Sequence, residues 1–509
     1  MLCIPFLLFS TPLPTARLIT LYNSLDPQSI SELLAFYHLY PETPQGKCAL
    51  SDAWELIHLH RKDKKKLEEP FILPSMEIEA LISVVNQQPL ETTTFLDNSQ
   101  LSLIESISDH LSNRKLKGYH IWDPTSLIAL PSEEIDLSHA LLLYQFKDAP
   151  LKVRQYEASL DLMALQILAR LPLEATNPEK IQAINHFIFH EKRFRFPPHS
   201  LWAKDIDLYT FLPSVLDSRL GVCLGVSILY LSIAQRLNLP LEVITPPGHI
   251  FISYNLGETP LNIETTAHGV HLPNRTYLGI NTRSLQKRTL KEVIGLAFIN
   301  QASVAWQKEK HPIAVDLYEK ALPYMPHDPL LKMLLGYNYL FVGQIKEGKK
   351  LLEEIRNVTF DHAVSKEITP EDFLLGKVDV EGIKAIFSQV DDTRQSILDK
   401  QAKLQDILSH HPHFRDGILQ LAITYLQLGR GHEACETLER YHALDSHNPV
   451  VEYYLATVYL HRFHYQKAWM HLKNVQSLTA QRQHSPHCLK DLRHMLRALF
   501  PDPDDQIYP

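Results

Sequence analysis

The chain has 509 residues, of which 45% are hydrophobic and 21% are charged, and it contains only 17 glycines. This length predicts about three domains, and together with the composition it excludes small disulfide scaffolds and collagen-like or Gly-rich chains. The 50 basic and 58 acidic residues give a net charge of −8, so the whole chain has no basic character that would attract nucleic acid or anionic lipid.

The chain begins with an apolar stretch, residues 1–9, which lacks a basic flank and is interrupted by Pro5. We therefore do not expect a secretory signal. No run approaches the ~20 apolar residues of a transmembrane helix. The five cysteines are far apart and odd in number, which favours a reducing compartment. We expect a cytoplasmic protein that does not cross a membrane.

Residues 1–150 read as a helical N-terminal region without a recognisable motif. Apolar spacing predicts helices over residues 30–38, 51–60, 76–86, 101–111 and 131–146. A further helix is expected over residues 153–171. Asn177 followed by Pro178 predicts an N-cap with proline at the first helical position, and then a helix over residues 180–191.

The segment most suited to chemistry surrounds Cys223. Gly221 precedes this cysteine and an apolar-rich helical pattern, residues 224–237, follows it, so we expect Cys223 at or near a helix N-terminus. Free backbone N–H groups and the helix dipole favour a thiolate at such a position. Arg219 is expected to brace the loop before the cysteine.

Three strands are predicted after this helix. They cover residues 241–245, 249–254 and 261–266, with turns at Pro246-Pro247-Gly248 and Asn255-Leu256-Gly257. His249 opens the second strand and Glu264 lies on the third. In a helix followed by an antiparallel meander, both side chains can lie beneath the helix N-terminus. A thiolate, an imidazole and a carboxylate then have compatible roles as nucleophile, general base and orienting group.

These residues carry a family resemblance. The run Arg219-x-Gly221-x-Cys223, together with Leu239-Pro240, Pro247-Gly248-His249 and Asn262-Ile263-Glu264-Thr265, resembles the transglutaminase-like superfamily, in particular its SirB-type branch. By that resemblance Cys223 matches the nucleophile, His249 the general base and Glu264 the orienting carboxylate. Many members have Asp at the position of Glu264, and some SirB-type relatives have lost the cysteine. The oxyanion donor stays open between the backbone N–H of Cys223 and a side chain of Trp202, Tyr209 or Asn185.

The C-terminal half contains an internal repeat. Small and aromatic positions recur 34 residues apart, as in Ala302 to Gly336 and Ala422 to Ala456. The pattern resembles the tetratricopeptide repeat over residues 295–355 and 415–475, and residues 357–414 fit it poorly, with a helix near 395–408. Stacked repeats form an extended concave surface, which predicts protein or peptide binding.

No cofactor or metal site is predicted. His484, His487, Cys488 and His494 lack a zinc spacing, and so do His410, His411 and His413. The chain has neither a phosphate-binding loop nor a dinucleotide fingerprint. It also lacks an acidic, oxygen-rich calcium loop.

The sequence therefore predicts a mainly helical α+β protein. We expect a helical region at 1–150, a transglutaminase-like, papain-like helix-plus-antiparallel-sheet core at 151–290, helical repeats at 291–480 and a tail at 481–509. The predicted function is thiol-dependent acyl transfer on an amide or peptide bond, with hydrolysis favoured over transamidation. The alternative is a non-catalytic interaction adaptor that retains the scaffold.

Overall fold

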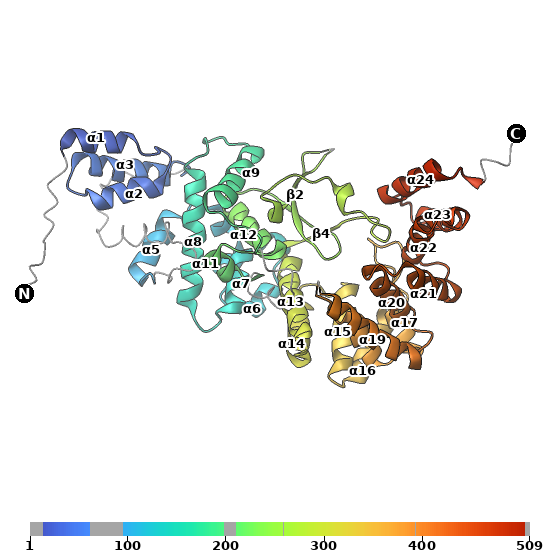
Figure 1. Cartoon of the computed structure of the whole chain (residues 1–509). Coiled ribbons are helices and arrows are strands. Elements are labelled where there is room, and N and C mark those ends of the chain that lie inside the picture. Colours follow the sequence, from blue (N-terminus) through green and yellow to red (C-terminus); the bar gives the residue numbers. More distant parts are fainter. Residues whose placement is uncertain (1–13, 62–94, 198–209, 258, 392, 504–509) are drawn as a thin grey trace, which may run out of the picture. The chain divides into compact units, whose positions relative to one another are not determined.

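A computed structural model describes residues 14–61, 95–197, 210–257, 259–391 and 393–503. The described chain is mainly helical and contains a small antiparallel sheet of four strands, so the α+β class is confirmed (Figure 1). Within these residues, no helix has the length and apolar character needed to cross a membrane. Contacts divide the chain into two compact units. The first contains residues up to Phe194 with Leu212–Arg219 and Ile228–Pro240, and the second contains the rest.

The first unit is built from helices. They are α1 (Thr15–Asn23), α2 (Ile30–Leu39), α3 (Pro44–His58), α5 (Asn98–Ile107), α6 (Pro124–Ile128), α7 (Leu137–Gln145), α8 (Pro150–Leu168), α9 (Asn177–Asn185), α11 (Leu212–Ser218) and the later part of α12 (Cys223–Arg236). A π-helical stretch, His186–Glu191, continues α9. The helix predicted at residues 76–86 lies outside the described residues.

Local capping explains where two of these helices differ from the predicted bounds. The α9 cap is Thr176, one residue before the predicted Asn177, because Thr176 and Glu179 form a reciprocal capping box. The pattern over residues 131–146 predicts one helix, but α7 starts only at Leu137. The side chain of Asp136 accepts a hydrogen bond from the backbone N–H of His139 and so fixes that start.

A buried ion pair fixes the later part of α12 in the first unit. The Arg236 side chain is fully buried and donates from Nε to Oδ1 of Asp161 on α8 at 2.7 Å. The same guanidinium donates to the Ser138 hydroxyl at 3.0 Å. Removing one partner of such a buried pair is expected to cost about 3–5 kcal/mol, because an uncompensated charge would remain inside the protein.

The second unit contains the sheet, whose strand order is β3-β2-β1-β4. The strands are β1 (Glu242–Thr245), β2 (Phe251–Tyr254), β3 (Leu261–Ile263) and β4 (Gln286–Arg288), and all neighbours are antiparallel. The three predicted strands are thus present, although β2 begins two residues after His249 and β3 ends one residue before Glu264. Both side chains therefore lie just outside the strands.

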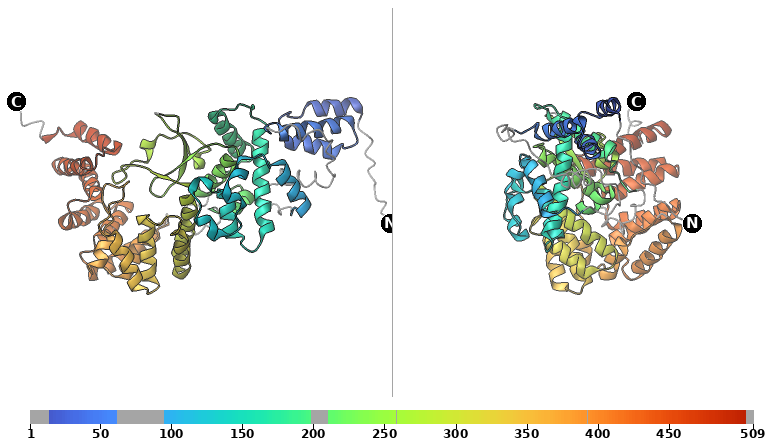
Figure 2. Two further views of the ribbon diagram at one scale, coloured as in Figure 1. Left: turned by 180° about the vertical axis from the view of Figure 1, so that it is seen from behind. Right: turned by 90° about the vertical axis from the view of Figure 1, so that its left-hand side faces the viewer.

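Paired helices form the rest of the second unit. Four antiparallel pairs match the predicted repeats: α13 (Leu290–Gln307) with α14 (His311–Ala321), α15 (Pro329–Phe341) with α16 (Ile345–Ile355), α20 (Arg415–Gln427) with α21 (Gly431–Leu444), and α22 (Pro449–His461) with α23 (Tyr465–Ala480). Figure 2 shows these helices from behind, in yellow to red.

Small residues lie where these helices touch. Ala422, Ala434, Ala456 and Ala468 are completely buried. A Cβ added to Gly348 would lie 2.9 Å from the carbonyl oxygen of Gly336 on the neighbouring helix. The repeated small positions therefore mark close approach between helix backbones.

Between the two sets of pairs lie three further helices, α17 (Thr369–Leu374), α18 (Val380–Phe387) and α19 (Arg394–His410). The last of these confirms the helix expected near residues 395–408. A final helix, α24 (His487–Leu499), lies in the stretch expected to be a tail. Its Leu489, Leu492 and Leu496 are buried in the same apolar core as the repeats, so this apolar face explains why the segment is folded.

Candidate active site

Cys223 is the first residue of α12 and its side chain is half-buried. The predicted position at a helix N-terminus is thus present. The approach to the helix is held by Gly221, whose N–H donates to the carbonyl oxygen of Arg195 at 3.1 Å. The first N–H groups of a helix have no partner within it, and the helix dipole favours negative charge there. A thiolate at Cys223 would gain from both effects.

His249 follows a tight turn between β1 and β2. The His249 N–H donates to the carbonyl oxygen of Pro246 at 3.1 Å, and Gly248 adopts a φ of 72°. Proline at the second position and a left-handed glycine at the third are typical of a type II turn. The sequence Pro246-Pro247-Gly248 therefore fixes the backbone from which the imidazole projects.

Glu264 lies close to His249 across the sheet. The pairing of β2 with β3, continued by one residue, places Glu264 opposite Phe251. Nε2 of His249 donates to Oε2 of Glu264 at 2.7 Å. The Glu264 side chain is only 5% exposed, whereas that of His249 is 26% exposed. The carboxylate is thus enclosed while the ring retains access to solvent.

Two further residues, which were not identified from the sequence, donate hydrogen bonds to the carboxylate of Glu264. Tyr277 donates its hydroxyl to Oε2 of Glu264 at 2.6 Å, and its ring stacks with those of His249 and Phe251. Thr266 donates to Oε1 from its hydroxyl at 2.7 Å and from its N–H at 3.2 Å. Tyr277 carries no motif and lies in an irregular segment, so the sequence offered no signal for its role.

The pKa values in this group depend on these contacts. Burial alone would lower the pKa of His249, but hydrogen bonds and charges from Cys223 and Glu264 outweigh burial and raise that pKa to about 10. Burial would raise the pKa of Glu264, but hydrogen bonds from His249, Tyr277 and Thr266 lower it to about 2. At neutral pH the imidazolium and the carboxylate are therefore the expected forms.

The helix and the carboxylate segment are also linked directly. The Thr265 hydroxyl, next to Glu264, lies 3.1 Å from the hydroxyl of Ser227 and donates to the carbonyl oxygen of Cys223 at 3.5 Å. Ser227 is one turn after Cys223 on α12. These contacts fix the first turn of the helix relative to the segment that carries the carboxylate.

The sequence also suggested three side chains as candidate oxyanion donors and a bracing role for Arg219. Trp202 and Tyr209, two candidate oxyanion donors, lie outside the described residues. The side-chain oxygen of the third, Asn185, accepts the hydroxyl of Tyr230 at 3.0 Å. Arg219 adopts a left-handed φ of 55° in the loop before Cys223.

Cys223 and His249 line a pocket of about 600 Å³. Its remaining walls include Pro246 and Pro247 of the turn, and Leu296 and Ile299 of α13. Ligand pockets in proteins commonly have volumes of about 300–1,000 Å³ and mostly apolar walls. The thiol and the imidazole therefore face a space large enough for a peptide side chain or a similar group.

Among the described residues, the two histidine clusters considered in the sequence do not gather around a common point. His484 instead donates from Nε2 to the carbonyl oxygen of Gly279 at 2.7 Å, and His410 bonds through Nδ1 to the carbonyl oxygen of Asp406 at 3.0 Å. In the described part of the chain, the group of possible metal ligands that does come together is His442, Glu452 and His471.

This group, which we call the Glu452 cluster, was missed because its members lie on different repeat helices. Glu452 is completely buried and accepts hydrogen bonds from Nδ1 of His442 at 2.5 Å and from Nδ1 of His471 at 2.9 Å. Asn474 donates to the same carboxylate at 3.0 Å. Burial would raise the pKa of Glu452, but the hydrogen bonds from His471 and Asn474 lower it. The separations of His471 and Asn474 from Glu452 are those of ordinary hydrogen bonds, and that of His442 is shorter.

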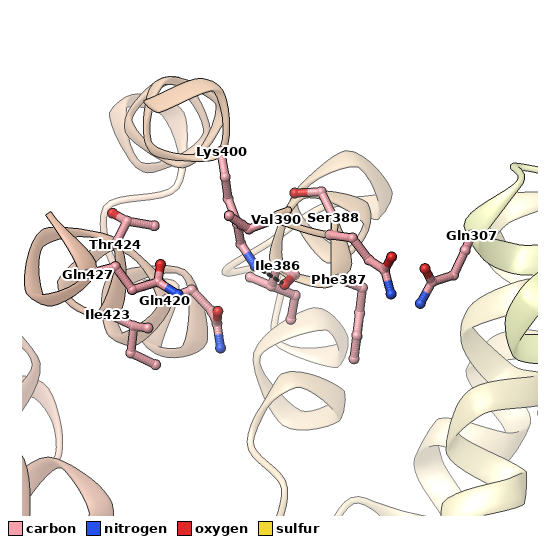
Figure 3. A pocket seen from close by; sticks show the side chains of 11 residues that line it. Gln307, Ile386, Phe387, Ser388, Val390, Lys400, Gln420, Ile423, Thr424 and Gln427 are labelled. Atoms are coloured by element: carbon pink, nitrogen blue, oxygen red, sulfur yellow. Dashed lines mark hydrogen bonds between the residues drawn. The ribbon is translucent and has the colours of Figure 1, made fainter. Parts of the chain in front are cut away.

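A second pocket, of about 320 Å³, lies among the repeat helices (Figure 3). The amide side chains of Gln307, Gln420 and Gln427 line it, together with Phe387. Lys400 donates from Nζ to the carbonyl oxygen of Ile386 at 3.0 Å. Amide groups both donate and accept hydrogen bonds, which suits contact with a peptide backbone.

Comparisons with known proteins found the following similarities. Residues 154–295 match the model of the transglutaminase-like superfamily. No curated protein matches the chain. Solved structures that are similar include a mutant of MamA, at 18% identity over 37% of this chain and 98% of that one, with a TM-score of 0.19. Another is TTC0263, described as a thermophilic TPR protein in Thermus thermophilus, at 18% identity over 40% of this chain and 97% of that one, with a TM-score of 0.20. Residues 154–295 therefore form a transglutaminase-like domain, and the paired helices described above follow it in the chain.

Proposed function

We propose that the protein is a cytoplasmic, thiol-dependent acyl-transfer enzyme that acts on amide or peptide bonds, with Cys223, His249 and Glu264 as its catalytic group. The observation that carries the proposal is the hydrogen bond of His249 to Glu264 at 2.7 Å. Cys223 also raises the pKa of this imidazole ring, and the ring lines a pocket. The four cysteines in the described part of the chain are all unpaired, which suits a reducing compartment.

The reaction follows from the roles of the three side chains. Nε2 of His249 is engaged by Glu264, so Nδ1 is left to exchange a proton with the thiol. The thiolate of Cys223 attacks the carbonyl carbon of the substrate, and the backbone N–H of Cys223 helps to hold the oxyanion. The C–N bond then breaks, and the amine leaves with a proton from the imidazolium.

A second attack completes the cycle. Water gives a proton to His249 and attacks the thioester, which breaks the C–S bond, releases the carboxylic acid and restores the thiol. Glu264 holds the ring in the tautomer and orientation that both steps need. Hydrolysis is favoured over transamidation because water is always available as the acceptor.

The repeats are proposed to bind a protein or peptide. The pocket of Figure 3 supports this role, because its glutamine amides can pair with a peptide backbone beside the exposed Phe387. The alternative function, a non-catalytic adaptor, would keep this binding surface and lose the chemistry at Cys223.

Thiol labelling of the folded chain tests the proposal. Iodoacetamide at pH 6.5 should alkylate Cys223 at least tenfold faster than the exposed Cys48. Cys435 and Cys488 should be slower still, because burial raises the pKa of both thiols. Peptide mass spectrometry follows each site separately, and Cys223→Ser identifies the Cys223 product. Equal rates at Cys223 and Cys48 would contradict catalysis and favour the adaptor.

A further inference from the structure

The pocket at Cys223 has two walls that come from different parts of the sequence. The first wall consists of the start of α12, the turn before His249 and β4. The second includes residues of the repeat region: Leu296, Ile299 and Asn300 on α13, Leu330 on α15, and Phe360, His362 and Glu367 after α16. The helices that were expected to bind a separate partner thus also enclose the space in front of the thiol.

Hydrogen bonds tie the two walls together. The N–H of Val364 donates to the carbonyl oxygen of Asn281 at 3.0 Å, and the N–H of Arg283 donates to the carbonyl oxygen of His362 at 2.8 Å. The Asn281 side chain accepts the N–H and the hydroxyl of Ser365, both at 2.8 Å. The segments 281–283 and 362–365 therefore run together as a short irregular ladder beside the pocket.

An ion pair adds to this link. Arg288 on β4 donates from Nη1 to Oδ2 of Asp328, the N-cap of α15, at 2.8 Å. The two side chains are only 8% and 5% exposed, so solvent screens the pair weakly. Leu330 is two residues after Asp328, and its position relative to β4 is fixed by this contact. The repeat wall is therefore held in place before any ligand binds.

Part of the repeat wall is apolar: Leu296, Ile299 and Leu330 form this part, whereas Asn300, His362 and Glu367 line the same pocket elsewhere. Leu330 is 38% exposed, and Leu296 and Ile299 are half-buried. Apolar surface that lies open in a concave site gains free energy when a ligand removes it from water. A polar or charged side chain placed against these three apolar residues would instead lose hydration without gaining a hydrogen-bond partner from them.

We propose that this apolar wall, formed by Leu296, Ile299 and Leu330, selects acyl substrates with a large apolar side chain next to the scissile carbonyl. This inference rests on the proposed function, because it assigns the substrate class of the same thiol. The first helices of the repeat array are accordingly part of the substrate site. Leu330 is the residue best suited to a test, because it is exposed and its replacement disturbs the core least.

Two alkylating probes separate the preference of the pocket for an apolar group from the reactivity of the Cys223 thiol. Iodoacetamide and N-benzyl iodoacetamide react with the thiolate in the same way: a C–S bond forms and iodide leaves. They differ only in the apolar benzyl group. In the full-length protein, the rate at Cys223 for the benzyl probe, divided by that for iodoacetamide, should be about tenfold higher than the same ratio at exposed Cys48.

Variants of Leu330 should lower this ratio. Leu330→Gln is expected to reduce it about tenfold, and Leu330→Ala, which introduces no polar group, about threefold. Ile345→Gln is the matched control, because Ile345 is a similarly exposed apolar residue (41%) on α16 and does not line the pocket. The control should retain the wild-type ratio, and circular dichroism verifies folding of each variant.

The outcomes distinguish the two proposals. If iodoacetamide labels Cys223 rapidly but the ratio equals that at Cys48, or is the same in both Leu330 variants as in wild type, the apolar wall does not select substrate and this inference is wrong. If iodoacetamide labels Cys223 no faster than Cys48, the nucleophile itself is absent, and the proposed function is overturned together with the inference.

Discussion

Two regions of the molecule place imidazole rings against a buried carboxylate, and they differ in what else is present. In the candidate active site, Glu264 accepts a hydrogen bond from the imidazole ring of His249. Cys223 also raises the pKa of this ring, and the ring lines a pocket. In the Glu452 cluster, one carboxylate accepts N–H groups from two rings and an asparagine between packed helices. The same residue types thus serve different ends.

The difference lies in which ring atoms remain available. The His249 side chain is 26% exposed and lines the pocket, whereas that of His471 is 4% exposed and stacks on the ring of Tyr459. A buried carboxylate that accepts hydrogen bonds from all the surrounding donors stabilises the packing of the helices that carry them. A carboxylate that fixes a ring beside a thiol can support proton transfer. The predictions below test this contrast.

The largest effect on Cys223 labelling should come from Glu264→Gln, which is compared with the same substitution at Glu452. Each oxygen of Glu264 accepts two hydrogen bonds, so in Glu264→Gln the amide NH₂ must face donors while the charge is lost. We expect Cys223 labelling at pH 6.5 to slow by about 10- to 100-fold and the free energy of unfolding to fall by about 1–3 kcal/mol. Iodoacetamide kinetics and urea unfolding provide the two measurements.

Glu452→Gln is the matched variant at the second carboxylate. It should lower the free energy of unfolding by about 1–3 kcal/mol for the same reason, but leave Cys223 labelling at the wild-type rate. If Glu452→Gln slowed labelling as strongly as Glu264→Gln, the two regions would not be functionally distinct.

Overpacking of the repeats should have the next largest effect. Ala456 is completely buried between helices, so Ala456→Leu should lower the free energy of unfolding of the repeats by about 1–3 kcal/mol while Cys223 stays reactive. Thermal unfolding and thiol labelling of one sample measure both. The control is Gln466→Leu, at an exposed position of the same array. Equal unfolding temperatures for both variants would mean that Ala456 is not at a helix contact.

A smaller effect is expected from Tyr277→Phe. This change removes the hydroxyl that donates to Glu264 but keeps the ring that stacks on Phe251 and His249. Cys223 labelling should slow by about three- to tenfold, since one hydrogen bond contributes about 0.5–1.5 kcal/mol. The pH at which labelling is half-maximal should also shift, which a purely structural change would not cause. An unaltered pH profile would exclude a positioning role for Tyr277.

The pH dependence of stability gives a further test. The pKa of His249 is raised from 6.5 to about 10, so the stability that it contributes is complete below pH 6.5 and is lost as the pH rises through 10. The pKa of Glu264 is lowered from 4.5 to about 2, so its contribution is complete above pH 4.5 and is lost as the pH falls through 2. The difference in unfolding free energy between wild type and His249→Gln should therefore be largest at pH 4.5–6.5. A difference that grew from pH 7 to pH 10 would contradict the pairing.

The sequence predicted those features that depend on local pattern. Gly221 before an apolar helical run located the start of α12 at Cys223, and Pro247-Gly248 located the turn before His249. The 34-residue recurrence of small residues located the helix pairs, because close backbone approach requires small side chains at each repeat. Such signals are contained within a single element or its repeat.

Features that depend on three-dimensional proximity were not predictable. Tyr277 reaches Glu264 from an irregular segment, and the members of the Glu452 cluster come from α21, α22 and α23. The position of Glu264 after β3, rather than on it, follows from its isolated bridge to Val270, which no periodicity marks. Tertiary pairing decides all three, and no pattern of residue types along the chain encodes it.

The ladder between segments 281–283 and 362–365 limits how this protein can be divided. In sequence, the family match ends at residue 295 and the repeats follow, as if two modules had been joined. Yet Thr282 pairs with Ala363, and Arg283 also donates to the carbonyl oxygen of Asp361, so the backbone on each side of that boundary supplies partners for the other. A fragment cut at the boundary would expose these groups to water and open one side of the pocket. Exchange of the repeats for those of another protein would therefore have to conserve this ladder. The transglutaminase-like domain and the first repeats can thus be exchanged only together.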